Sequence, residues 1–370
     1  MISTPALPPP AIEQPAPHQA SFGLVNGRAA RGTRRVVVSV GGRVLASKPL
    51  RGRRFWLRVA LPVGDVAVRV TTIASGGRRS SRVVSEVYGL PAAARPRGVA
   101  GREDGVLAQR LRGLAQGYAG TAAVYVQSLT GGAGAAWNAK ARFPAGSTLK
   151  LAIASTVLAS HSGIPPPGSR VDSLLRAMIT RSDNAAANAL EIWLAGSTSA
   201  GANRVNTLMR SIGMDDSIMY GGYEVRTLAG RIPERVDEQP AFGTGKYTTA
   251  ADLATLFRAV WLAAGGRGPL RPAQPGFTPA DGRYLLWLLG HVSDSPKLDG
   301  IVRERRGVVV LHKAGWVLTA RHDAGLVFWK GGVFVAAVMT WRASGAGVSS
   351  DLLAGRCAAE ALERFRRLPR

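Results

Sequence analysis

The chain has 370 residues, 46% of them hydrophobic, so it is long enough for two domains and too apolar to be globally disordered. Its formal net charge of +25 comes from 48 Lys and Arg residues against 23 Asp and Glu residues, but the basic residues are spread along the whole chain. No helix-turn-helix, zinc-finger or RNA-binding motif accompanies them, so specific nucleic-acid binding is not expected, and attraction to an anionic cell wall or membrane surface explains the charge equally well.

The cysteine and histidine residues indicate neither a disulfide nor a metal site. Cys357 is the only cysteine, so no disulfide can form within the chain. The five His residues lack the spacing of a metal-binding motif, and neither a metal nor another cofactor is predicted. The sequence contains no apolar run long enough to predict a transmembrane helix, and its first residues show no signal-peptide pattern.

The N-terminal third of the chain shows two kinds of pattern. Residues 1–32 are rich in Pro and Ala without sustained periodicity, which predicts a disordered or extended lead-in. Residues 33–90 consist of short β-branched runs separated by turn signals such as Gly41-Gly42. Runs of this length and spacing predict a small antiparallel β-sandwich.

The predicted sandwich carries no catalytic constellation but is strongly basic. The first hundred residues contain 16 basic and 3 acidic side chains. The segment loosely resembles the immunoglobulin-like modules that precede catalytic domains in secreted bacterial proteins. We interpret it as a spacer or as a module that binds an anionic cell-wall surface.

Residues 91–101 (PAAARPRGVAG) predict a linker, and residues 102–370 a second domain. In chain order this domain shows a helix, two strands joined by a Gly-rich turn, a series of helices, three apolar strands and a C-terminal helix. The simplest assembly is one mixed, mostly antiparallel sheet whose first and last strands come from opposite ends of the domain. Helices would flank the sheet and form a helical subdomain, which makes the fold class α+β.

Ser147 and Lys150 stand in the stretch FPAGSTLK, where the pattern predicts that a helix begins at Ser147. Residues three apart on a helix share a face. A serine can be activated without a histidine if a neighbouring amine accepts its proton, and a lysine can do so when burial and a second cation lower its pKa. Because Ser is also a common N-cap residue, the pair alone leaves a purely structural interpretation open.

Two further stretches extend this chemistry. TRSDNAAANAL places Ser182 and Asn184 just ahead of a helix, and LHKAGW places Lys313 at the end of an apolar strand. Together with Ser147 and Lys150, in this order, they resemble the three motifs of the serine β-lactamase and penicillin-binding protein superfamily, and class A β-lactamases most closely. The stretch YTTAADLATLF and the order of elements in the whole second domain are similar as well.

The resemblance implies a role for each of these residues. Ser147 would attack a carbonyl carbon, with Lys150 as its proton partner. Ser182 would relay a proton to the leaving nitrogen, helped by the ammonium of Lys313. Asn184 would bind the amide side chain of the substrate.

The third motif departs from the family pattern. It reads Lys313-Ala314-Gly315 instead of K-T-G or K-S-G, so a hydroxyl that helps to hold the substrate carboxylate is missing. We hypothesise that Arg321 supplies a charged substitute. The oxyanion hole would use the backbone N–H of the nucleophile and that of Trp316, directly after Gly315.

The deacylating glutamate of class A enzymes has no clear counterpart. No E-x-x-L-N pattern occurs between Ser182 and Thr248. Glu224 is the candidate by position, with Glu234 and Glu238 as alternatives in the same loop. If none of them activates a water, the protein would be acylated and stall, as penicillin-binding proteins do.

Three functions therefore stay open for the second domain. The first is a class A β-lactamase-like serine hydrolase that cleaves β-lactam amides through an acyl-enzyme on Ser147. The second is a D-Ala-D-Ala carboxypeptidase, or another peptidase or esterase of cell-wall metabolism, and the third a cell-wall-binding protein that has lost turnover. In each case the expected partner is a β-lactam or a peptidoglycan peptide, the expected state is a monomer, and the resemblance implies an extracytoplasmic location.

Overall fold

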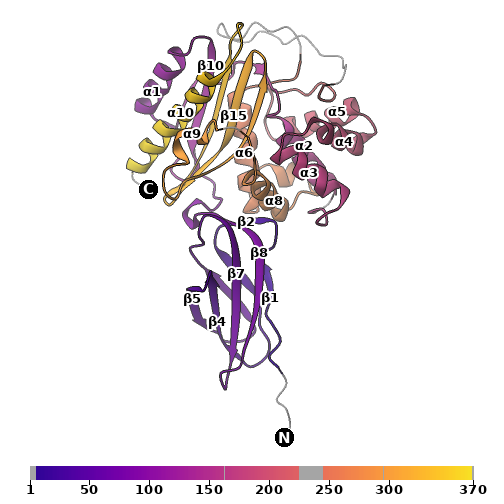
Figure 1. The fold of residues 1–370 in the computed structure, drawn as a ribbon, viewed down its shortest axis with the longest axis vertical. Helices are drawn as coiled ribbons and strands as arrows, with labels where there is room; N and C mark the ends of the chain where they lie inside the picture. Colours follow the sequence, from indigo (N-terminus) through magenta and orange to yellow (C-terminus); the bar gives the residue numbers. More distant parts are fainter. Residues whose placement is uncertain (1–5, 162, 225–244, 295, 369–370) are drawn as a thin grey trace. The chain divides into compact units, whose positions relative to one another are not determined.

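The computed structural model describes residues 6–161, 163–224, 245–294 and 296–368. The chain divides into two compact units, Met1–Arg95 and Pro96–Arg370 (Figure 1). The division falls inside the stretch 91–101 for which the sequence predicts a linker. Each unit has a hydrophobic core of its own.

The N-terminal unit is a β-sandwich of two sheets. One sheet has three antiparallel strands in the order β1-β3-β6, and the other has five strands in the order β2-β8-β7-β4-β5. The strands are β1 (Ala11–Gln14), β2 (Gln19–Ser21), β3 (Leu24–Arg28), β4 (Thr33–Val40), β5 (Arg43–Pro49), β6 (Arg54–Arg58), β7 (Gly64–Ala74) and β8 (Arg79–Gly89), followed by the short helix η1 (Ala92–Ala94). Buried and exposed residues alternate along β6 and β7, so each strand packs one side into the core.

The predicted disordered lead-in at residues 1–32 is wrong for the residues that the structure describes. Strands β1, β2 and β3 all lie within this stretch, and Val25 of β3 is fully buried in the core. The three strands are only three to five residues long. Strand β1 pairs with β3, whereas β2 and β3 pair with β8 and β6, which come much later in the chain. Local periodicity therefore could not reveal these strands.

The second unit is built on a six-stranded sheet in the order β14-β15-β16-β10-β11-β9. Its strands are β9 (Arg102–Glu103), β10 (Thr121–Ser128), β11 (Ala133–Trp137), β14 (Val309–Val317), β15 (Ala320–Trp329) and β16 (Gly332–Trp341). All pairs are antiparallel except β11 with β9. Strand β10 pairs with β16 along its whole length, which confirms that the two ends of the domain meet in one sheet.

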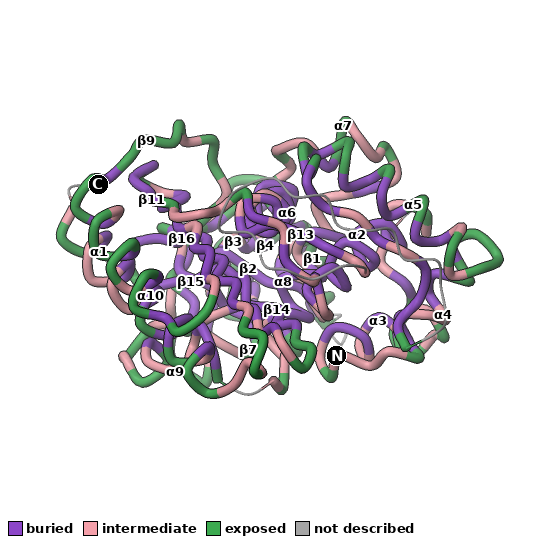
Figure 2. The backbone as a smooth tube through the Cα atoms, turned by 90° about the horizontal axis from the view of Figure 1, so that it is seen from above, coloured by how far each residue is buried: buried purple, intermediate pink, exposed green. Residues whose placement is uncertain are grey.

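Helices cover both faces of this sheet, as the sequence predicts. On one face α1 (Gly105–Gln116), α9 (Asp299–Val302) and α10 (Val348–Arg367) enclose a core with β10, β15 and β16. On the other face α6 (Ala250–Ala264) packs against the same strands and is buried along most of its length (Figure 2). The short helix α7 (Leu270–Ala273) and α8 (Pro279–Leu289) follow α6.

A helical subdomain lies beside the sheet and carries two of the three motifs. It consists of α2 (Lys150–His161), α3 (Arg170–Thr180), α4 (Asn184–Ala195) and α5 (Thr198–Ser211), and a small two-stranded sheet of β12 (Phe143–Pro144) and β13 (Tyr247–Thr248) adjoins it. Nine of the twelve residues of α2 are buried, so this helix is the centre of the subdomain. In the described ranges, no helix is both long and apolar enough to span a membrane.

Candidate active site

Ser147 lies in a tight turn between β12 and α2. The helix itself begins at Lys150, three residues later than the sequence pattern predicts. The amides of Thr148 and Lys150 donate to carbonyls three residues back, both at 3.2 Å, which is the tighter geometry of a turn or 3₁₀ segment. Ser147 therefore stands directly before the first turn of the buried helix.

Lys150 is fully buried, and neutral oxygen atoms hold its ammonium group. Its Nζ donates to the backbone carbonyl of Ser182 and to Oδ1 of Asn184, both at 2.5 Å. Burial, reinforced by the nearby Lys313 ammonium, lowers the pKa of Lys150 from 10.5 to about 7. A large fraction of this amine is thus unprotonated at neutral pH, as a base for a serine hydroxyl must be.

Ser182 lies between two lysines. Its Oγ accepts from Nζ of Lys313 at 2.9 Å and lies 3.5 Å from Nζ of Lys150. Its backbone has a φ of +59°, in the left-handed region that costs a non-glycine residue about 1 kcal/mol. Asp183, the next residue, accepts from the amide of Ala186 and caps α4, so the helix start holds Ser182 in place.

Lys313 lies on β14, and its side chain is fully buried. Burial lowers its pKa from 10.5 to about 8, although Asp294 and Asp323 partly oppose the shift. Near neutral pH Lys313 is therefore mostly protonated while Lys150 is about half neutral. The three predicted motifs meet at the hydroxyl of Ser182, with a potential proton acceptor on one side and a potential proton donor on the other.

The backbone around Gly146 and Ser147 approaches that around Gly315 and Trp316 so closely that no side chain fits between them. A Cβ atom on Gly315 would lie 2.7 Å from the nitrogen of Ser147, and one on Gly146 would lie 2.8 Å from the nitrogen of Trp316. Gly146 also has a φ of +53°. Both positions therefore require glycine, and the close approach brings the amides of Ser147 and Trp316, the two donors expected for an oxyanion hole, into one region of the site.

His322 fixes the segment that leads into Ser147. Its Nδ1 accepts from the amide of Thr340 at 3.1 Å, so its Nε2 carries the proton and donates to the carbonyl of Pro144 at 2.7 Å. Burial lowers the pKa of His322 from 6.5 to about 4, which keeps the ring neutral. The sequence shows no metal-like or catalytic spacing for this histidine, and its positioning role becomes visible only in the register of β15 with β14 and β16.

Tyr223 is a second residue that sequence reasoning missed. The side chain of Asn188, four residues after Asn184 on α4, holds the backbone of Tyr223 by two hydrogen bonds of 2.6 and 2.8 Å. The ring centroid of Tyr223 lies 4.6 Å from Nζ of Lys150 and 4.6 Å from Nζ of Lys246. An aromatic ring therefore covers one face of Lys150.

Glu224 borders the same cleft. The cleft has a volume of about 410 Å³, and among the residues that line it are Ser147, Asn184, Tyr223, Glu224 and Trp316. The side chain of Glu224 is exposed and its φ is +54°. Its predicted role as the base for deacylation stays a prediction, and the alternatives Glu234 and Glu238 lie outside the described residues.

The hypothesis that Arg321 replaces the missing hydroxyl is wrong. Arg321 makes two hydrogen bonds to Asp351 of α10, at 2.7 and 3.1 Å. The side chain of Lys313 lies on one face of β14, and that of Trp316, three residues later, lies on the other. Arg321 of β15 is directly opposite Trp316, so its side chain lies on the same face as Trp316, where α10 packs. The sequence distance to Lys313 is short, but the alternation of side chains along a strand sends Arg321 away from the cleft.

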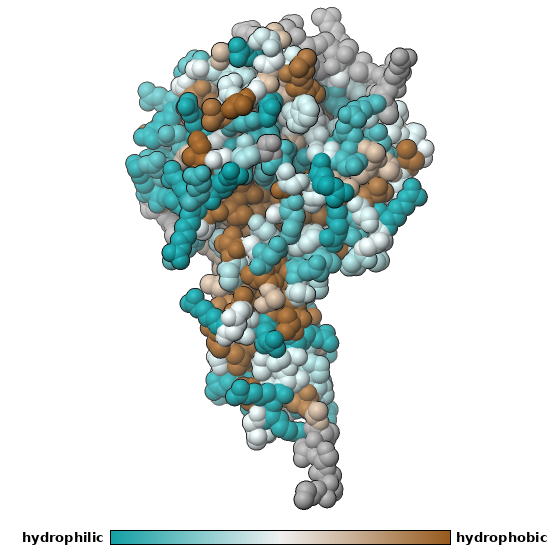
Figure 3. All heavy atoms as spheres, viewed as in Figure 1, coloured by the Kyte–Doolittle hydropathy of each residue, from teal (hydrophilic) through white to brown (hydrophobic). Residues whose placement is uncertain are grey.

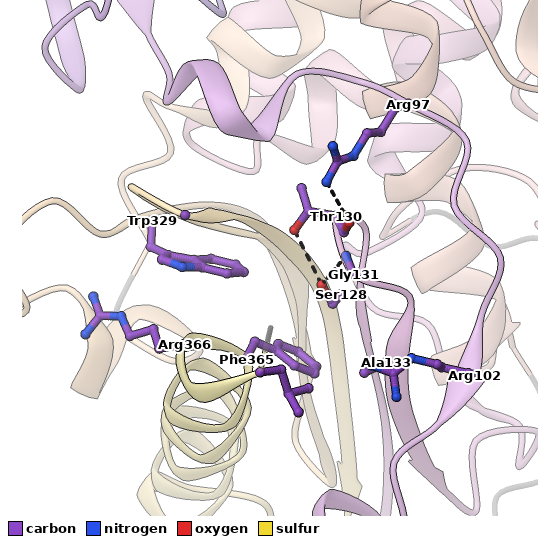
Figure 4. Close-up of a pocket in the computed structure, with 11 residues that line it drawn as sticks. Arg97, Arg102, Ser128, Thr130, Gly131, Ala133, Trp329, Phe365 and Arg366 are labelled. Carbon is purple, nitrogen blue, oxygen red and sulfur yellow. Dashed lines mark hydrogen bonds between the residues drawn. The ribbon is translucent and has the colours of Figure 1, made fainter. Parts of the chain in front are cut away.

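A second cavity of the same unit contains none of these residues. It has a volume of only about 40 Å³, and Arg97, Arg102 and Arg366 contribute to its lining (Figure 4). Arg97 donates to the carbonyl of Thr130 at 2.7 Å. Ligand pockets usually measure about 300–1,000 Å³, so the cleft at Ser147 is the better candidate. Within the described ranges, no three His, Cys, Asp or Glu side chains form a group that could hold a metal ion.

The chain is similar to known proteins in sequence and in fold. A family model described as the beta-lactamase enzyme family matches residues 106–163 and 161–365. The chain belongs to the beta-lactamase enzyme family. The fold is that of class A β-lactamases, as the sequence predicts, preceded by an all-β module.

Several solved structures share the fold of this beta-lactamase family member at low sequence identity. A mutant of PBP-A, described as an acyl-enzyme complex with penicillin G, is 20% identical with a TM-score of 0.56 and covers 73% of this chain and 100% of its own. A beta-lactamase from Sphaerobacter thermophilus is 22% identical with a TM-score of 0.54, over 72% of this chain and 100% of its own. A class A beta-lactamase from Mycobacterium abscessus is 19% identical with a TM-score of 0.54, over 70% of this chain and 99% of its own. No curated protein matches the chain.

Proposed function

We propose that the second unit is a serine hydrolase that opens β-lactam amides through an acyl-enzyme on Ser147. The observation that carries this proposal is the pair of buried lysines on either side of the Ser182 hydroxyl. With pKa values of about 7 for Lys150 and about 8 for Lys313, one amine can accept a proton at the pH at which the other still holds its own.

The reaction would combine one nucleophilic attack with three proton transfers. The Oγ of Ser147 forms a bond to the carbonyl carbon while its proton passes to the neutral amine of Lys150. The negative charge on the carbonyl oxygen is stabilised by the amides of Ser147 and Trp316. When the C–N bond breaks, the nitrogen takes the hydroxyl proton of Ser182, which Lys313 replaces. Water then hydrolyses the ester and releases the acid.

The proposal is tested with a chromogenic cephalosporin, which reports turnover, and a fluorescent penicillin, which reports stable acylation. We expect both compounds to acylate the wild-type protein and neither to acylate the Ser147→Ala variant. Intact-mass spectrometry locates the adduct on the protein. A wild type that reacts with neither compound at millimolar concentrations would contradict the assignment of Ser147 as the nucleophile of a β-lactam-opening enzyme.

A second candidate is a penicillin-binding enzyme with a long-lived acyl-enzyme, such as a D-Ala-D-Ala carboxypeptidase. The observation that favours it is Tyr223, whose ring occupies one face of Lys150. The only described carboxylate that lines the cleft is that of the exposed Glu224. Among the described residues, Glu224 is therefore the carboxylate that would have to activate a hydrolytic water.

The two candidates differ in the lifetime of the acyl-enzyme. If Glu224 activates the water, Glu224→Gln converts turnover into a stoichiometric burst of cephalosporin opening, while the acylation rate stays unchanged. If wild type already gives only a burst, and the adduct persists for hours, the penicillin-binding candidate is correct. Either substrate class lies outside the cytoplasm, and we propose that the protein works there.

A further inference from the structure

The three-stranded sheet of the N-terminal unit carries exposed cationic and aromatic side chains on its outward face. Strand β6 buries Phe55 and Leu57 in the core. Its alternate residues Arg54, Trp56 and Arg58 therefore point outward. Trp56 is 52% exposed, and the guanidinium carbon of Arg58 lies 4.8 Å from the centroid of its ring.

The neighbouring strand adds charge to this face instead of neutralising it. Arg28 of β3 lies directly opposite Arg54 of β6. Like charges in this position destabilise a sheet, and neither side chain forms an ion pair with a described acidic residue. Glu13 of β1, the acid on the same face, accepts instead from Nδ2 of Asn26 at 2.8 Å. The outward face is therefore positive, and within the described part of the chain no ion pair neutralises Arg28 or Arg54.

A groove adjoins this face between β5 and β6, which are edge strands of the two sheets. It has a volume of about 510 Å³. Lys48 and Arg51 stand at its rim beside Arg54, whereas Val36 and Leu57, both buried, form its apolar floor. Hydrophilic and apolar side chains lie close together on the N-terminal unit in the space-filling view (Figure 3).

Protection of the sheet edges accounts for only part of this pattern. Charged side chains and proline on an edge strand prevent strand pairing with other chains, which is a sufficient reason for Lys48 and for Pro49 on β5. An exposed tryptophan on the edge strand β6 has the opposite effect, because it adds apolar surface where pairing must be avoided. Trp56 is the one exposed aromatic residue in the described part of this unit, and it lies among the cations.

We propose that Trp56 and the adjoining groove bind the glycan strand of peptidoglycan with its carboxylate-bearing stem peptides. A sugar ring can stack on the face of Trp56 that Arg58 leaves free, and the carboxylates can pair with Arg54, Arg58 and Lys48. Single-stranded nucleic acid fits less well, because proteins that bind it stack successive bases on several aromatic side chains. The choice of polymer rests on the proposed function of the second unit. Attachment to the polymer would raise the effective concentration of its peptide substrate.

The test uses the full-length protein and purified peptidoglycan sacculi from which phosphate-containing polymers have been removed. Binding is measured by co-sedimentation across a range of salt concentrations. We expect Trp56→Ala to weaken binding about tenfold or more, as the loss of a central aromatic contact usually does. The double variant Arg54→Ser/Arg58→Ser should bind at least tenfold more weakly and show a smaller salt dependence.

A matched double variant controls for net charge. Arg69→Ser/Arg79→Ser also removes two exposed cations, but from β7 and β8 of the five-stranded sheet. It should bind within about twofold of wild type if the site is specific. Ser147→Ala should bind like wild type, so a failure of the catalytic proposal does not affect this assay. The variants of the N-terminal unit should keep a thermal unfolding midpoint close to that of wild type, because the changed side chains are exposed.

Three outcomes would overturn the proposal. Unchanged binding by Trp56→Ala would exclude the tryptophan face. Equal losses of binding affinity in the two double variants would show that binding depends only on the net charge of the protein. Binding to a single-stranded oligonucleotide or to soluble polyglycerol phosphate, but not to stripped sacculi, would assign the site to a different polymer.

Discussion

The two units place their cationic side chains in opposite environments. In the second unit Lys150 and Lys313 are fully buried beside neutral oxygen atoms, and burial lowers the pKa of both. In the N-terminal unit Arg54 and Arg58 project from a sheet into solvent. A buried lysine can give up its proton near neutral pH and act as a base, whereas an exposed arginine keeps its charge and can only attract anions. One residue class thus serves chemistry in one unit and, as we propose, binding in the other.

The largest effect should follow from loss of the buried amine. Lys150→Met keeps a long unbranched side chain, one atom shorter, but removes the group that accepts the Ser147 proton, so acylation by a fluorescent penicillin should slow about 10³-fold or more. Stopped-flow fluorescence measures the rate. The double variant Arg54→Ser/Arg58→Ser should leave the acylation rate unchanged. A comparable decrease in this variant would contradict the separation of roles between the two units.

A smaller but still large effect should come from Gly315→Ala. The added Cβ would lie 2.7 Å from the nitrogen of Ser147, so the two backbones must move apart, which displaces the Ser147 amide from the proposed oxyanion hole. Loss of an oxyanion donor typically costs about 10²–10³ in rate. Gly113→Ala, in α1 with nothing within 4 Å of the new atom, is the matched control and should acylate like wild type. Equal rates in both variants would show that this amide does not act in the reaction.

His322 should make the stability of the second unit depend on pH. Its pKa is about 4 in the fold and near its ordinary value of 6.5 when unfolded. The unfolded chain thus binds more protons between these values, and stability falls as the pH falls from about 6.5 toward 4. From pH 7 to pH 5 the loss should be about 2 kcal/mol. Urea unfolding of wild type and His322→Gln at both pH values measures it, and the pH-dependent loss should be smaller in the variant.

The smallest of these effects is the pH dependence of acylation. With a pKa of about 7, Lys150 is mostly protonated at pH 6, so the rate there should be about tenfold below its maximum. Above about pH 8 the rate should fall again as Lys313 loses its proton. Single-turnover rates between pH 5 and pH 10 give the profile, with Glu224→Gln as control. A rising limb near pH 4–5 would indicate a carboxylate base instead of Lys150.

Much of the second unit could be predicted because its signals are local. The Ser-x-x-Lys spacing, the Ser182-Asp183-Asn184 helix start and the apolar strand before Lys313 can each be read within a dozen residues. The motif order then indicates that they meet, and the structure brings them to one hydroxyl. The positions of Tyr223 and His322 could not be predicted this way, because both depend on partners distant in the chain, Asn188 in one case and Pro144 in the other.

The errors have the same origin. Arg321 is close to Lys313 in sequence, but strand alternation and the carboxylate of Asp351 turn it to the other face of the sheet. Strands β1 to β3 are too short to show a period, and two of them pair with strands that come later in the chain, β2 with β8 and β3 with β6.

The sequence by itself determined the fold class, the family and the identity of the nucleophile candidate with its lysine partners, because these depend on residue types at fixed short spacings. Only the tertiary structure decided which pKa values are shifted, which ring covers Lys150 and which glycines are required. Burial, register and close backbone approach are properties of segments that meet in space, and the chain does not encode them at any one place. The cationic residues illustrate this difference. The sequence does not distinguish a buried lysine from an exposed one, whereas the fold buries Lys150 and Lys313, lowers their pKa values and leaves Arg54 and Arg58 as surface charges.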